Sequence, residues 1–136
     1  MSAIMWMSLL LPALTTGCAE VEPVSRLERV DEAVTDGGLY TLSLTPEPDP
    51  PVAGPAALGL RIIDADGADV EGASIALDVW MPDHGHGVSQ PPIVSDEGGG
   101  EYTAEWTYSM PGYWELTVEV SGPGGDDNVV VAYDVR

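Results

Sequence analysis

The sequence predicts an all-β protein, a seven-stranded antiparallel β-sandwich of the immunoglobulin-like type. From about residue 38 to the end of the chain, apolar and polar residues alternate in short runs, as in strands with one buried face. Turns rich in glycine and proline separate these runs at regular spacing, and no convincing helical pattern interrupts them. Half-polar strands favour two packed antiparallel sheets over a parallel sheet, whose strands would be apolar on both faces.

Seven runs make up the predicted strands. The proline-rich segment 47–55 ends the first run, because proline cannot donate to a strand ladder, and residues 64–67 form a turn after the second. The residues expected to face the core are, run by run, Tyr40, Leu42 and Leu44; Leu58, Leu60 and Ile62; Ile75, Leu77 and Val79; Ile93 and Val94; Tyr102, Ala104, Trp106 and Tyr108; Trp114, Leu116, Val118 and Val120; and Val129, Val131, Tyr133 and Val135.

The composition fits one domain with an acidic surface. The chain has 136 residues, enough for one compact core, and a formal net charge of −19 from 23 acidic residues against four arginines. This charge argues against nucleic-acid backbones and anionic membrane surfaces as partners and is compatible with cations. The carboxylates are spread along the chain, so a solvated acidic surface is the favoured explanation, and the charge does not locate a site.

Residues 1–17 are expected to be an export leader of the lipoprotein type. They hold no charged side chain and are mostly apolar, but they fall short of the roughly 20 residues of a transmembrane helix. The sequence Leu14-Thr15-Thr16-Gly17-Cys18 resembles the lipobox of bacterial lipoproteins, which are lipidated on the cysteine. The resemblance implies a lipid anchor on Cys18 and a location in the cell envelope, facing the periplasm or the cell exterior. The alternative is an ordinary signal peptide followed by an unpaired cysteine.

Residues 18–37 are expected to be an acidic tether between the anchor and a folded domain of residues 38–136. A short helix is the alternative, since Ser25 and Glu28 could form a capping box. Three apolar residues also recur there at helical spacing, namely Leu27, Val30 and Val34. A spacer is favoured because so narrow an apolar stripe stabilises little by itself.

Both histidines of the chain, His84 and His86, lie in one glycine-rich loop after the third predicted strand. On a locally extended chain, residues two apart lie on the same side at about 6.6 Å, so the two imidazoles can converge on one ion. Gly85 and Gly87 allow positive φ values that would let the loop fold around a ligand. Met81 is close by, and its thioether is a soft ligand suited to cuprous copper. The alternative is an exposed turn whose histidines bind nothing.

The predicted topology brings a second methionine to this loop. If consecutive strands run in opposite directions, the histidine loop and the loop that holds Met110 emerge at the same end of the sandwich. The candidate metal ligands are therefore His84, His86, Met81 and Met110, a set that suits copper, most readily cuprous copper. Asp83 in place of a methionine would favour cupric copper or zinc. Alternatively Met110 only packs against the core, and Trp80 either shields the site or is itself a core residue.

These residues resemble the YtkA-like family, which is related to FixH-type proteins. The resemblance covers roughly residues 38–136 and rests on Trp80-Met81-Pro82, the HGHG run, Gly100-Glu101-Tyr102 and the stretch from Met110 to Val118. It implies a small extracytoplasmic immunoglobulin-like domain, often anchored to the membrane. It also implies a link, seen in some relatives, to copper handling and to an oxidase-assembly client.

Two functions follow from these observations. The first is a copper-binding or copper-delivery lipoprotein, with zinc as the alternative metal. The second is a non-catalytic interaction module, whose loops contact another envelope protein and whose histidines are incidental. An enzyme is not expected, because no serine or cysteine nucleophile stands beside a histidine in a recognisable arrangement and two histidines alone give no catalytic triad.

Overall fold

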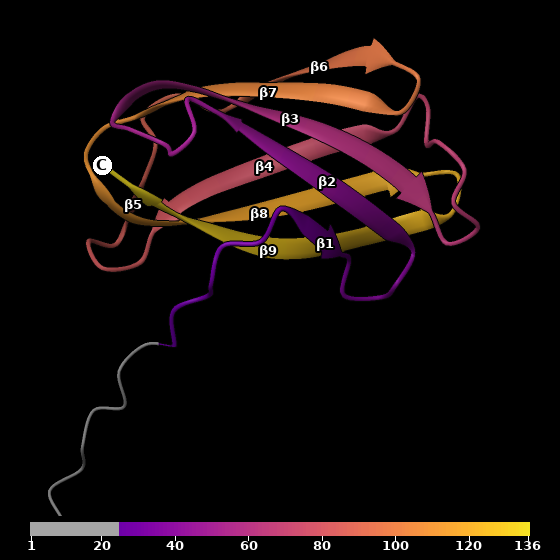
Figure 1. Ribbon diagram of the computed structural model, residues 1–136, viewed down its shortest axis with the longest axis horizontal. Coiled ribbons are helices and arrows are strands. Elements are labelled where there is room, and N and C mark those ends of the chain that lie inside the picture. Colours follow the sequence, from indigo (N-terminus) through magenta and orange to yellow (C-terminus); the bar gives the residue numbers. More distant parts are fainter. Residues whose placement is uncertain (1–24) are drawn as a thin grey trace, which may run out of the picture.

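The computed structural model describes residues 25–136, which form two sheets packed face to face (Figure 1). The predicted all-β sandwich is thereby confirmed. The predicted leader and the predicted lipidation site at Cys18 lie outside the described residues, and within residues 25–136 no helix could cross a membrane. The strands are β1 (Glu32–Val34), β2 (Tyr40–Glu47), β3 (Gly54–Asp64), β4 (Ser74–Met81), β5 (His86–Gly87), β6 (Ile93–Gly98), β7 (Glu101–Tyr108), β8 (Gly112–Gly122) and β9 (Gly125–Val135).

The strand order is that of an immunoglobulin-like sandwich. One sheet has the order β1-β2-β3-β7-β6 and the other β5-β4-β8-β9, and neighbouring strands are antiparallel throughout. The seven predicted strands correspond to β2, β3, β4, β6, β7, β8 and β9, which reproduce the two sheets of a constant-type domain. The additional strands β1 and β5 have three and two residues, too few to leave a periodic pattern in the sequence.

The core lies between the sheets and is built from the inward-facing residues of the alternating runs. Its largest fully buried side chains are Trp114, Tyr40, Tyr102, Tyr133, Leu42, Leu58, Leu60 and Ile62. The prediction for Ile93 is wrong, because this side chain is 68% exposed. Val94 is paired with the buried Ala104 and packs against the core, so its neighbour Ile93 must point outward.

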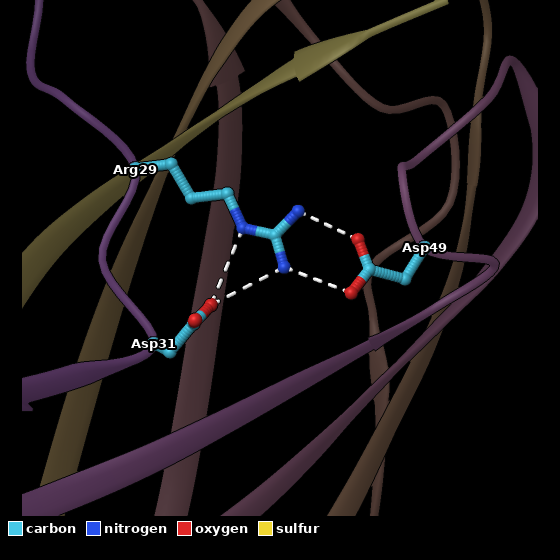
Figure 2. Close-up of polar contacts among 3 residues, drawn as sticks. All are labelled: Arg29, Asp31 and Asp49. Atoms are coloured by element: carbon cyan, nitrogen blue, oxygen red, sulfur yellow. Dashed lines mark hydrogen bonds and ion pairs between the residues drawn. The ribbon is translucent and has the colours of Figure 1, made fainter.

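Residues 25–37 pack against the sandwich, which differs from the expected tether. The alternative of a helix is wrong, since β1 pairs with β2 and its side chain at Ala33 enters the core. Arg29 links the loop after β2 to the other sheet. Its guanidinium forms ion pairs with Asp49 in that loop and with Asp31 (Figure 2), and it lies 5.5 Å from the ring centre of Tyr133 on β9. The hydrogen bond between Arg29 and Asp49 is the main cause of a raised pKa for Arg29 and a lowered pKa for Asp49.

The loop after β1 is tied to β9 through the carboxylate of Asp127. This carboxylate accepts hydrogen bonds from the hydroxyl of Thr35 at 2.6 Å and from the backbone N–H groups of Gly37, Leu39 and Asn128. The bond from Thr35 is the largest cause that lowers the pKa of Asp127 to about 2 from its ordinary 3.8. Ionised Asp127 therefore stabilises the fold fully above its unfolded pKa, and this contribution is lost as the pH falls through about 2.

We expect Asp127→Asn to lower the urea midpoint of unfolding at neutral pH, because an amide NH₂ cannot accept the hydrogen bonds that a carboxylate oxygen accepts. The difference from the parent protein should shrink as the pH falls from about 4 to about 2. Asp126→Asn, at the exposed neighbouring position, is the matched control and should leave the midpoint unchanged. A loss of stability that is the same at every pH would contradict the role assigned to the charge.

Candidate metal site at one end of the sandwich

The connections from β2 to β3, from β4 to β6 and from β7 to β8 lie at the same end of the sandwich, as the strand directions predicted. Gly54, the first residue of β3, is paired with Tyr108, the last residue of β7. The C-terminal residue Arg136 also exchanges backbone hydrogen bonds with Pro51 and Ala53 at this end. In Figure 1 it is the end that carries β5 and the C-terminus.

The histidine loop is a tight turn closed by its own backbone. The carbonyl oxygen of Met81 accepts hydrogen bonds from the N–H of Gly85 at 2.9 Å and of His84 at 3.3 Å. Gly85 has the predicted positive φ, at 65°. The expectation of a locally extended chain at His84 is wrong, because these bonds fold the chain back on itself. The expectation of a positive φ at Gly87 is also wrong: glycine is needed there because a Cβ would lie 2.9 Å from the carbonyl oxygen of Val79.

The turn determines which residue stands opposite Met81. It pairs β5 with the end of β4 so that His86 stands opposite Met81, and directly opposed residues of an antiparallel pair project from the same face. The ring of His84 lies next to that of His86, with centroids 5.9 Å apart. Two imidazoles bound to one ion at a metal–nitrogen distance of about 2.0 Å have centroids roughly 5 to 6 Å apart, so this spacing fits a shared metal ion.

The orientation of His86 leaves one ring nitrogen available as a ligand. Its Nδ1 lies 3.2 Å from the carbonyl oxygen of Gly87, a contact that the Nδ1-protonated tautomer makes as a donor. In that tautomer Nε2 carries the free lone pair, as in metal-binding histidines whose second nitrogen is held by a carbonyl. The ring also meets the indole of Trp114 edge-on, at 5.7 Å between centroids.

The two methionines lie on the inner side of this end. Met81 is buried, and a Cβ on Gly112 would overlap its Cε methyl group, so its side chain reaches the connection that carries Met110. Met110 is half-buried against the core, and its carbonyl oxygen accepts a hydrogen bond of 3.1 Å from Nε1 of Trp114. Packing of Met110 is therefore observed, and ligation by either sulfur stays a prediction.

The surroundings limit which other groups can serve as donors. Burial raises the pKa of Tyr133 to about 12 and that of Tyr108 as well, so these phenols stay neutral and are poor ligands. Among the described residues, no three side chains of His, Cys, Asp or Glu are grouped to hold a metal. The thioethers of Met81 and Met110 stay the predicted additional donors at this end.

A comparison with protein families bears on this arrangement. A family model described as YtkA-like matches residues 29–119, more than half of the chain. The chain belongs to the YtkA-like family. The matched region holds all four candidate ligands of this YtkA-like domain, begins before residue 38 and ends within β8. No curated protein matches the chain.

Two contacts at the histidine loop of this YtkA-like protein were not predicted from the sequence, that of Arg26 with Asp83 and that of Trp114 with His86. Arg26 forms an ion pair with Asp83 in the histidine loop, although the two are 57 positions apart in the sequence, so no local pattern signals the contact. Trp80 is not a core residue: it is 43% exposed and lies beside Gly87, while Trp114 on β8 is the fully buried tryptophan. Alternation does assign Trp114 to the core, but it does not predict the contact with His86.

Proposed function

We propose that this YtkA-like protein is a copper-binding lipoprotein of the cell envelope that holds cuprous copper at its histidine loop. The observation that carries the proposal is the pairing of His86 with Met81, which sets an imidazole and a thioether on one face with a second imidazole alongside. His84 and His86 would be the primary ligands, and Met81 and Met110 the soft partners.

The donor set favours copper over zinc. Thioethers are soft ligands that select cuprous copper, whereas zinc prefers thiolates, imidazoles and carboxylates. The burial of Met81 keeps its sulfur in apolar surroundings, and the excess of 23 acidic residues over four basic ones attracts cations. The bound copper ion would then be available for delivery to another envelope protein, such as an oxidase-assembly client.

The proposal includes a location and a mode of action. A lipid on Cys18 would anchor the protein, with the domain facing the periplasm or the cell exterior. The protein would bind and hand over metal without catalysing a reaction, because the loop offers ligands and no activated nucleophile. The formal net charge of −19 argues against nucleic acid as a partner.

The test is an anaerobic competition titration of cuprous ion against a coloured chelator, with the purified full-length protein. We expect the parent protein to bind one ion and His84→Ala/His86→Ala to bind at least about a hundredfold more weakly. Met81→Leu and Met110→Leu, which keep side-chain volume, should weaken cuprous binding and so measure the contribution of each sulfur. Far-ultraviolet circular dichroism verifies that the variants are folded. Equal affinity of the parent and the double variant for cuprous ion would refute the proposal.

An interaction module is the second candidate, and a pocket at the same end favours it. The pocket has a volume of about 590 Å³ and is lined by Ile93, Pro91 and Trp106, among others. Ile93 is a large apolar side chain that is mostly exposed. If this function is correct, an envelope protein co-purifies with the parent in the presence of a metal chelator, and Ile93→Asp abolishes the association.

A further inference from the structure

We propose that Arg26 determines which metal the histidine loop accepts, by holding the carboxylate of Asp83 away from the two imidazoles. This inference rests on the proposed metal site. It adds a specificity-determining residue that lies outside the loop, in the segment that precedes β1.

Arg26 is fixed by several contacts at the edge of the loop. One guanidinium nitrogen forms the ion pair with Asp83, and the guanidinium carbon lies 4.9 Å from the ring centre of Tyr113. The hydroxyl of Tyr113 accepts a hydrogen bond of 2.8 Å from the backbone N–H of Leu27, which holds the next residue of the segment on the same ring. Tyr113 itself is buried on β8, so the arginine packs against a side chain that the sandwich holds in place.

The carboxylate of Asp83 is the hard donor nearest in sequence to the two histidines. Asp83 immediately precedes His84 in the turn, and a carboxylate beside two imidazoles would make a set that suits zinc or cupric copper. In the described structure these three groups do not form such a cluster, and the carboxylate is engaged by Arg26. The arginine thereby leaves the thioethers as the additional donors.

The charge of Arg26 acts in the same direction. Together Arg26 and Asp83 are neutral, but Asp83 without Arg26 adds a full negative charge beside the site. The resulting attraction grows in proportion to the charge of the bound ion, so it favours a divalent ion twice as strongly in free energy as a monovalent one. Loss of Arg26 should therefore shift selectivity towards Zn²⁺ and Cu²⁺.

The experiment compares Zn²⁺ and Cu⁺ binding by full-length parent protein, Arg26→Ala and Arg26→Ala/Asp83→Asn. We expect Arg26→Ala to bind Zn²⁺ about tenfold more tightly and Cu⁺ no more than about threefold more tightly. The double variant should return to the zinc affinity of the parent, because the freed carboxylate is gone. Arg26 and Asp83 are 56% and 39% exposed, so the substitutions should leave the core and the urea midpoint almost unchanged.

Arg29→Ala is the matched control. It removes an arginine from the same segment that also makes ion pairs and a ring contact, but its partners are Asp31, Asp49 and Tyr133 instead of the histidine loop. Equal effects of Arg26→Ala and Arg29→Ala on zinc affinity, or no effect of either, would overturn the inference. A parent protein that binds no Cu⁺ would refute the proposed function instead, so the two failures are distinguishable.

Discussion

Replacing Trp114 with alanine is expected to lower the free energy of unfolding by about 3–5 kcal/mol, as for other fully buried aromatic side chains. Trp114 is completely buried, and its ring packs between Tyr108, at 5.3 Å between centroids, and His86. Its indole N–H also satisfies the carbonyl oxygen of Met110. Alanine would leave a cavity under the histidine loop and an unpaired carbonyl beside it, so the loop should lose order together with the core.

The measurement is urea unfolding followed by far-ultraviolet circular dichroism, a signal that does not depend on tryptophan fluorescence. Trp80→Ala is the matched control, because Trp80 is 43% exposed and should cost less than about 1 kcal/mol. Trp114→Phe retains most of the packing, loses the indole donor and provides a measurable variant if the alanine variant does not fold. Similar losses for Trp80→Ala and Trp114→Ala would contradict the assignment of Trp114 as the central packing residue at this end.

Replacing Gly112 with alanine is expected to destabilise the fold by about 2–3 kcal/mol, from two costs at one position. Gly112 has a φ of 140°, a conformation that residues with a side chain rarely adopt, and its added Cβ would overlap the methyl group of Met81. Met81 is fully buried, so it can give way only by disturbing its neighbours. The same displacement would move a proposed sulfur donor, so cuprous affinity should fall as well.

Gly54→Ala separates the backbone cost of a positive φ from the cost of the overlap with Met81. Gly54 has a φ of 115° at the same end of the sandwich, but a Cβ there would meet no atom within 4 Å. The Gly54→Ala variant should therefore show only the backbone cost of about 1 kcal/mol, with unchanged metal affinity. Urea unfolding and the chelator titration measure both quantities. If Gly112→Ala is no worse than Gly54→Ala, the close contact between Met81 and Gly112 has no energetic consequence.

The strands could be predicted from the sequence because the information is local. Tyr102, Ala104, Trp106 and Tyr108 alternate with polar residues over eight positions, and burial of one face converts this pattern directly into β7. The prediction failed in the segment before the first long strand, where the local sequence pattern is weak. Residues 25–37 hold a weak helical spacing, yet backbone pairing with β2 and the ion pairs of Arg29 with Asp31 and Asp49 make this segment part of the sandwich.

The candidate site divides in the same way. Sequence and strand direction predict the pair of histidines, the glycine turn and the position of Met110 at the same end of the sandwich. The register that opposes Met81 to His86 depends on how the turn closes on the Met81 carbonyl, and one residue of slippage would send His86 to the other face. The contact of Arg26 with Asp83 depends on the path of a segment distant in sequence.

The alternating strands, the acidic surface and the residue types that can bind a metal are all readable from the amino-acid order, because these properties belong to single residues and their near neighbours. Three features depend on the folded arrangement: which donors share a face, which of Trp80 and Trp114 is buried, and where Arg26 contacts the histidine loop. Those features arise when packing of the two sheets fixes register and brings distant segments together, and no local pattern encodes that step.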